Sequence, residues 1–144
     1  MRLMSTVGSL GYNETVMEHF RNPRNMGEIA DPDAAGTAGN EACGDVMTMY
    51  LKVKAAASED PLDDIVEDVK VLVFGCGAAI ASSSVATELA KGKKLREAQK
   101  ISKDDVLKAL GGLPLLKLHC SVLATEALEV TINDYLARRK NGVR

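Results

Sequence analysis

The sequence contains no tryptophan and only five aromatic residues among its 144. So few rings leave no base-stacking platform for a nucleic acid. The formal net charge of −2 likewise provides no basic excess to attract one. No stretch approaches the roughly 20 consecutive apolar residues of a membrane-spanning helix. These absences predict a protein whose partners are neither nucleic acids nor membranes.

Cysteine is also scarce, with Cys43, Cys76 and Cys120 separated by 33 and 44 residues. A secreted disulfide scaffold would be denser in cysteine and would usually have an even number. Reduced thiols inside a cell are the better interpretation. Residues 1–11 contain one Arg and no sustained apolar stretch, so we expect neither a secretory signal nor a transit peptide there. The expected location is the cytoplasm, or the mitochondrial matrix if a presequence has been removed.

The composition is that of a globular protein, with 46% hydrophobic and 26% charged residues. A chain of this length can bury roughly 70% of the surface that its unfolded form exposes, without a disulfide or a metal to hold the core. We expect residues 1–11 to be a flexible N-terminal segment. Residues 12–140 should form one domain, and residues 141–144 a short tail.

Two strands are predicted from alternating hydrophobicity. In residues 46–53, Met47, Met49 and Leu51 alternate with more polar neighbours, and residues 65–74 form a second such segment. The loop between them suggests a long antiparallel hairpin. One weaker strand is expected within residues 26–43.

The period then changes to that of a helix. Residues 78–91 predict a helix packed by small side chains, ended by Gly92. Residues 13–20, with Asn13 as N-cap, residues 102–110, and residues 121–139 predict three more. Strands followed by helices indicate an α+β fold, in which a small antiparallel sheet is packed against several α-helices.

The three cysteines all fall at turns rather than inside elements. Cys43 comes immediately before the first good strand, and Cys76 lies between a strand and a helix with glycine on each side. Cys120 follows His119 at the expected start of the last helix. A helix N-terminus favours the thiolate, the form that binds metals and accepts sulfur, so Cys76 and Cys120 both qualify.

Each remaining polar residue has an ordinary structural explanation when taken alone. Asp45 is typical of a turn, and His119 attracts attention only because Cys120 follows it. The acidic residues of 59–68 and the basic residues of 91–96 are interpreted as solvated faces. If the three cysteine turns converge, however, three sulfurs, an imidazole and a carboxylate would fit Zn²⁺ or an iron–sulfur cluster. Spacing alone does not show that they converge.

Four separated motifs, in order, closely resemble the IscU/NifU-type iron–sulfur cluster assembly scaffolds, from about Tyr12 to Leu136. The matching pieces are Tyr12 with Glu18-His19-Phe20-Arg21-Asn22-Pro23-Arg24-Asn25-Met26-Gly27, then Ala42-Cys43-Gly44-Asp45, then Phe74-Gly75-Cys76-Gly77-Ala78-Ala79-Ile80-Ala81-Ser82-Ser83-Ser84, and Lys117-Leu118-His119-Cys120-Ser121-Val122-Leu123-Ala124.

The resemblance implies a non-catalytic scaffold on which a transient [2Fe–2S] cluster is built and then handed on. Cys43, Cys76 and Cys120 would be the cluster thiolates, with Asp45 and His119 as competing or auxiliary ligands. Cys120 would be the persulfide acceptor. Lys117 would be a further auxiliary group. The implied metals are iron and, in the apo form, Zn²⁺ at the same groups.

The partners implied by the resemblance are a cysteine desulfurase of the IscS/NifS type, apo iron–sulfur acceptor proteins, and an electron donor or iron-handling protein. The family's chaperone-recognition stretch is typically Leu-Pro-Pro-Val-Lys. Residues 113–117 of this chain lack its second proline, which weakens the case for an Hsp70-type chaperone as a partner.

Three other functions remain open at this point. The first is a zinc-binding sulfur acceptor that stimulates a desulfurase without building a cluster, although the gap from Cys76 to Cys120 leaves no room for the long insertion of the zinc-dependent SufU branch. The second is a thiol enzyme using Cys120 with His119, for which no oxyanion site is evident. The third is a purely structural zinc domain, which a core of this size does not need.

Overall fold

The computed structural model describes residues 11–40 and 44–140, where it contains three strands, five α-helices and two short 3₁₀ helices. In chain order these elements are α2 (Glu14–Arg21), β1 (Ala34–Asn40), β2 (Asp45–Lys54), η1 (Pro61–Asp63), β3 (Ile65–Phe74), α3 (Gly77–Ala90), α4 (Leu95–Ala98), α5 (Lys103–Leu110), η2 (Leu115–Lys117) and α6 (His119–Lys140). The predicted α+β fold class is confirmed.

The three strands form one antiparallel sheet in the order β1-β2-β3. The predicted hairpin is confirmed, with Val46 paired to Phe74 at one end and Lys54 to Ile65 at the other. Along β2, the Met47, Met49 and Leu51 side chains are fully buried and their neighbours are only half-buried. The alternating sequence pattern therefore gives the sheet one apolar face.

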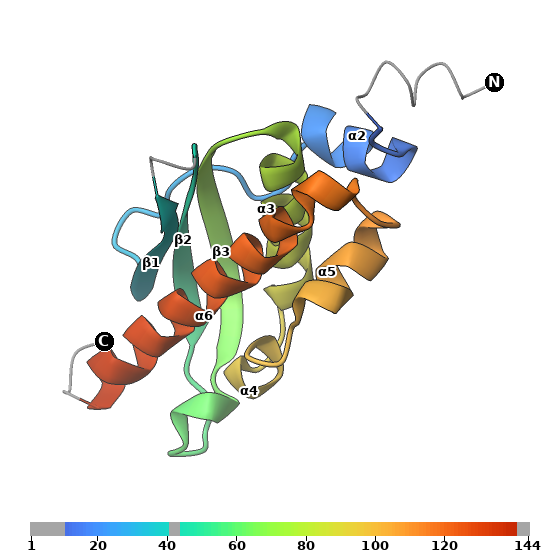
Figure 1. The fold of residues 1–144 in the computed structure, drawn as a ribbon. Coiled ribbons are helices and arrows are strands. Elements are labelled where there is room, and N and C mark those ends of the chain that lie inside the picture. The colour runs from blue at the N-terminus through green and yellow to red at the C-terminus, as the bar shows by residue number, and fades with distance from the viewer. Residues whose placement is uncertain (1–10, 41–43, 141–144) are drawn as a thin grey trace.

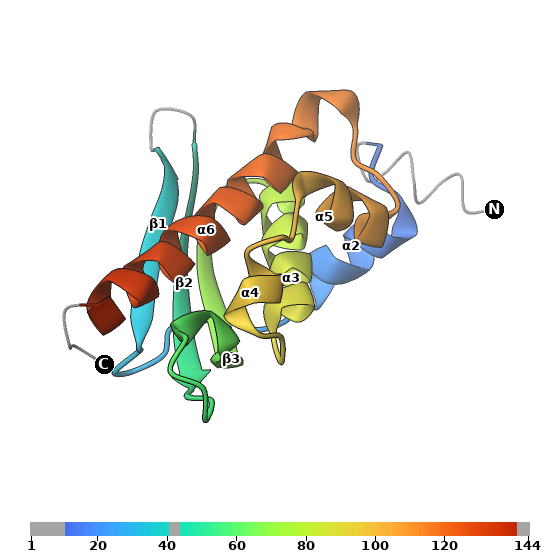
Figure 2. The same cartoon turned by 90° about the horizontal axis from the view of Figure 1, so that it is seen from below.

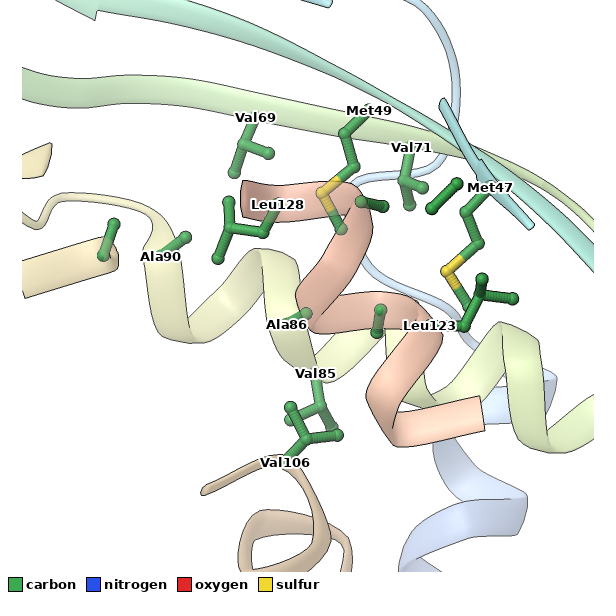
Figure 3. Close-up of a cluster of buried hydrophobic side chains, with 14 of the residues drawn as sticks. Met47, Met49, Val69, Val71, Val85, Ala86, Ala90, Val106, Leu123 and Leu128 are labelled. Carbon is green, nitrogen blue, oxygen red and sulfur yellow. The ribbon is translucent and has the colours of Figure 1, made fainter. Parts of the chain in front are cut away.

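Helices α3 and α6 both pack on that apolar face, α6 across β1 and β2, and α3 beside β3. Figures 1 and 2 show the resulting two layers, with the sheet on one side and the helices on the other. Figure 3 shows the core between them, where Met47 and Met49 of β2 meet Leu123 and Leu128 of α6. Burial of such apolar side chains is the main stabilising term of the fold.

The small residues of α3 let neighbouring elements approach it closely. All of its Ala and Ser residues from Ala78 to Ser84 are buried, and the one larger residue among them, Ile80, is half-buried. The Ser84 hydroxyl accepts the Arg24 backbone N–H at 2.9 Å, and the segment after α2 is thereby fixed to α3. The expected helix packed by small side chains is confirmed.

Most predicted boundaries agree with the structure to within two residues. Asn13 caps α2 through the Val16 N–H, and Ser102 with Asp105 forms the capping box of α5. The sequence does not predict α4, η1 and η2, because these helices are too short to show a helical period. The last helix starts at His119, two residues before the predicted start.

One expected solvated residue is buried. Asp64 is fully inaccessible, and its carboxylate accepts hydrogen bonds from the Tyr135 hydroxyl at 2.6 Å and from the Ala56 N–H at 2.8 Å. Arg139 pairs with the same carboxylate. The interpretation of Asp64 as part of a solvated face is wrong, because these partners replace the water that a buried charge would lose. In the described ranges, no helix combines the length and apolar character needed to cross a membrane.

Candidate metal centre

Four predicted site residues meet at one end of the sheet. Because β2 and β3 are antiparallel, β2 begins where β3 ends, and α3 and α6 both start beside that end (Figure 1). Asp45 is the first residue of β2, and Cys76 is the N-cap of α3. His119 and Cys120 are the first two residues of α6. The fold therefore brings together side chains that lie up to 75 positions apart in the chain.

Their donor atoms form a connected set. The sulfurs of Cys76 and Cys120 lie 3.7 Å apart, and His119 Nε2 lies 3.7 Å from the Cys120 sulfur. Asp45 Oδ2 lies 3.3 Å from the same imidazole nitrogen. One ligand atom each from Asp45, His119 and Cys120 lies within 4.8 Å of the other two.

Each of the three shorter separations matches that of two donors on one tetrahedral ion, although Cys76 lies outside the group whose ligand atoms are all within 4.8 Å of one another. Two sulfurs bound to one zinc at about 2.3 Å and a tetrahedral angle would be about 3.8 Å apart, and a sulfur and a nitrogen about 3.6 Å apart. A nitrogen and an oxygen would be about 3.3 Å apart by the same geometry. Soft sulfur and borderline imidazole donors suit zinc and iron, whereas the carboxylate is a harder ligand. The residues present therefore suit an ion of this class.

Asp45 also holds the backbone of the site. Its Oδ1 accepts the backbone N–H of Cys76 at 3.1 Å. A Cβ at Gly75 would collide with that same oxygen, so only glycine lets the β3–α3 connection approach the carboxylate. The residue before Asp45 is Gly44, whose φ of +82° lies in the left-handed region. Only glycine adopts this conformation at low cost. Two glycines of the predicted motifs are thus explained by the position of Asp45.

The site is enclosed on one side and open on the other. Cys120 is completely buried and Asp45 nearly so, Cys76 is half-buried, and the His119 side chain is 60% exposed. Burial, reinforced by the neighbouring Cys76, raises the pKa of the Cys120 thiol to about 12. The expectation that the helix N-terminus would favour the Cys120 thiolate is wrong for this structure, because burial and the neighbouring Cys76 both favour the neutral thiol.

Lys117 extends the set from η2. Its ammonium group lies close enough to Cys76 for negative charge on that side chain to raise the pKa of Lys117. The pKa of the nearby Tyr12 phenol is also raised, first by burial and then by Cys76. In the sequence Tyr12 stands out only as part of a family motif, and no periodicity or spacing links it to Cys76.

The remaining predicted ligand, Cys43, lies outside the described residues. Its role, like the ligand roles of the other residues, stays a prediction. The described part of the site consists of two thiols, an imidazole and a carboxylate, with an ammonium and a phenol beside them.

Two features define the class of this protein: a small α+β fold, and a set of thiol, imidazole and carboxylate groups at one end of its sheet. Comparison with known families identifies the family to which such a protein belongs. Residues 11–142 match the model of the NifU-like N-terminal domain, so the chain belongs to that family. The predicted family is confirmed.

Named relatives agree with this assignment. The chain is 55% identical over 131 residues to iron–sulfur cluster assembly scaffold protein IscU 1 of Archaeoglobus fulgidus, covering 91% of this chain and 79% of that protein. It is 42% identical over 134 residues to the IscU of Escherichia coli strain K12, covering 91% of this chain and 98% of the relative.

A solved structure shows the same architecture. The N-terminal part of a nitrogen-fixing NifU-like protein from Brucella abortus matches with a TM-score of 0.62 at 25% identity, covering 88% of this chain and 94% of that one. The α+β arrangement of sheet and helices is therefore shared with a NifU-like protein.

Proposed function

We propose that this protein is a non-enzymatic scaffold on which a [2Fe–2S] cluster is assembled and from which it is transferred to apo acceptor proteins. The observation that carries the proposal is the 3.7 Å approach of the Cys76 and Cys120 sulfurs, with His119 and Asp45 around them. The names of the relatives point in the same direction.

In this proposal Cys43, Cys76 and Cys120 are the thiolate ligands of the cluster, and Asp45 and His119 compete with them or complete the set. An exposed imidazole and a hard carboxylate make a site that exchanges ligands more readily than one closed by four thiolates. Easy exchange suits a cluster that is cargo rather than a resident cofactor. Lys117, close to Cys76, offsets the negative charge that accumulates when the thiols ionise.

The partners follow from the chemistry of the cargo. A cysteine desulfurase supplies sulfur as a persulfide, which must be reduced to sulfide, so an electron donor is required alongside a source of iron. Cys120 is the proposed persulfide acceptor. Since its thiol is buried and its pKa is about 12, we expect transfer to Cys120 only when docking of the desulfurase exposes or deprotonates it.

A second function is favoured by the same distances. Because three of them match the separations of donors on one tetrahedral zinc ion, the protein could instead be a zinc-binding sulfur acceptor that stimulates a desulfurase and never builds a cluster. The two functions differ in whether iron enters the site.

The test supplies the reduced, metal-free protein with ferrous iron, cysteine, a desulfurase and a reductant under anaerobic conditions. We expect the visible absorption and the Mössbauer signature of a [2Fe–2S] cluster, and its loss in Cys43→Ser, Cys76→Ser and Cys120→Ser. Asp60→Asn, an exposed acidic residue paired with Arg96, serves as the control. The absence of any iron signal, together with zinc binding by the same metal-free protein in a parallel titration, would support the sulfur acceptor instead.

Mass analysis after desulfurase treatment without iron separates the persulfide roles. We expect the added sulfur on Cys120 in the parent protein and its absence in Cys120→Ser. Sulfur found on Cys76 or Cys43 in both proteins would remove Cys120 from the acceptor role.

A further inference from the structure

The N-terminus of α3 is capped in an unusual way. Cys76 occupies the N-cap position, yet its side chain makes no capping hydrogen bond. The first amides of a helix have no partner within the helix, and a side chain at the N-cap usually accepts one of them. Here the N–H of Cys76 itself donates to Asp45. The N–H of Ala78, at the second helical position, is one that an N-cap side chain would ordinarily take.

Tyr12 provides that missing acceptor from a distant part of the chain. Burial raises the pKa of the Tyr12 phenol, which is near enough to the backbone N–H of Ala78 for that group to lower the pKa against this rise. The ring is buried and lies against the first residue of α3, since a Cβ at Gly77 would be 3.3 Å from Tyr12 Cε2. The absence of a side chain at Gly77 thus leaves the space that the ring needs.

The backbone beside Tyr12 is anchored independently of α3. Asn13 caps α2 through its Oδ1, which accepts the Val16 N–H at 2.8 Å. Its Nδ2 donates to the carbonyls of Leu110 at 3.0 Å and Gly112 at 3.3 Å. The start of α2 is therefore tied to the end of α5, and Tyr12 meets α3 from a fixed support.

We propose that Tyr12 is a positioning residue for Cys76: it makes the capping contact of α3 and so leaves the Cys76 sulfur free of the helix amides and directed toward Cys120. Asp45 accepts the Cys76 N–H and Tyr12 takes the Ala78 N–H, so neither amide group attracts the Cys76 sulfur. The effect on metal binding rests on the proposed ligand role of Cys76, whereas the capping contact does not.

A double-mutant cycle on the metal-free, reduced protein tests the capping claim. Tyr12→Phe keeps the ring and removes only the acceptor. We expect it to lower the folding equilibrium constant about fivefold, the size of one capping contact. In a Cys76→Ser background the loss should be less than about twofold, because serine can cap the helix itself. Equal losses in both backgrounds, measured by denaturant titration, would overturn the claim.

Tyr50→Phe is the matched control. Tyr50 is half-buried on β2, where it pairs with Lys70 on the sheet face away from the helices. The same removal of a hydroxyl there should give the same small change in both backgrounds. A change that depends on residue 76 would show that the cycle does not isolate α3 capping, and the claim would fall.

Cobalt(II) binding tests the consequence for the site. We expect Tyr12→Phe to weaken binding about fivefold and to lower the sulfur-to-cobalt charge-transfer absorbance per bound ion, because the Cys76 sulfur turns toward the Ala78 N–H. Weaker binding with an unchanged absorbance per ion would reduce Tyr12 to a stabilising role and contradict the positioning claim. If the parent protein gave no charge-transfer band, the proposed metal site would fail, and the cycle alone would decide the capping claim.

Discussion

The Asp45 carboxylate links the two cysteine-bearing helices by accepting the Cys76 N–H with one oxygen and approaching His119 Nε2 with the other. The first contact fixes the start of α3 relative to β2, and the second fixes the start of α6. Asp45 is therefore both a potential ligand and a structural bridge. Its two roles can be separated by substitution.

Replacing Asp45 should change how long a cluster stays bound. We expect Asp45→Ala to fold, at a cost of about 1–3 kcal/mol because the Cys76 N–H loses its acceptor. The variant should hold a reconstituted cluster longer and transfer it more slowly, since no carboxylate remains to compete for iron. The measurement is the decay of the visible absorption band together with the rate of transfer.

Asp45→Asn is the matched control, because an amide oxygen still accepts the Cys76 N–H but carries no charge. It should restore most of the lost stability and retain the longer cluster lifetime. Equal cluster lifetimes in the parent and both variants would remove the ligand-exchange role of Asp45.

A methyl group at Gly75 should disturb the site from the backbone. In Gly75→Ala the new Cβ would collide with Asp45 Oδ1, so we expect loss of the Asp45–Cys76 hydrogen bond and weaker zinc or cobalt binding. Gly92→Ala is the comparison. Its φ of +86° makes alanine strained, yet no atom lies near the new Cβ. Both variants should be less stable, and metal binding that falls equally in both would contradict the explanation.

The position of Asp45 illustrates what the sequence could and could not predict. Its place before a strand and beside Cys43 was visible, and so were the strands, the four longer helices and the family motifs. The convergence of Cys76 with Cys120 depends on how α3 and α6 pack against the sheet, which no local pattern specifies. For the same reason, the contact between Tyr12 and Ala78 could not be inferred.

The buried Cys120 thiol predicts a pH dependence of stability in the metal-free protein. Its pKa of about 12 lies above the ordinary value of 9.0, so the folded state holds this proton more tightly than the unfolded state does. Its contribution is fully present below about pH 9 and is lost as the pH rises toward 12. Denaturant titrations across this range should show a falling stability, and Cys120→Ser should flatten the curve. The Tyr12 phenol, whose pKa is also raised, adds to the slope in both proteins.

The same proton must leave when a metal binds to Cys120. Zinc titrations by calorimetry in two buffers of different ionisation enthalpy, near neutral pH, should therefore report proton release, and Cys120→Ser should release fewer protons per ion bound. Identical proton release in the parent and the variant would exclude Cys120 as a thiolate ligand of zinc.

The Asp64 network predicts a purely structural effect. Tyr135→Phe removes the hydroxyl that donates to buried Asp64 at 2.6 Å, and we expect a loss of about 1–3 kcal/mol in unfolding free energy. Metal affinity should be unchanged, because Tyr135 is four turns along α6 from the site. A change in cobalt binding without a change in stability would show that this network communicates with the metal centre.

The buried Asp64 also marks the limit of reading charge from a sequence. Its acidic neighbours Asp60 and Asp63 pair with Arg96 near the surface, and nothing in the run of acidic residues distinguishes Asp64 from them. The distinguishing partners are Tyr135 and Arg139, more than 70 residues later. Only the packing of α6 brings them to it.

Cluster transfer tests the central claim most directly. The protein reconstituted with ⁵⁷Fe and desulfurase-derived sulfur is mixed anaerobically with an apo [2Fe–2S] acceptor, the two are separated, and Mössbauer spectra of both are recorded. We predict that the [2Fe–2S] signal moves from this protein to the acceptor, and moves more slowly from Asp45→Ala. An iron signal that never forms, or one that stays with this protein while the acceptor remains empty, would contradict the assignment as an assembly scaffold.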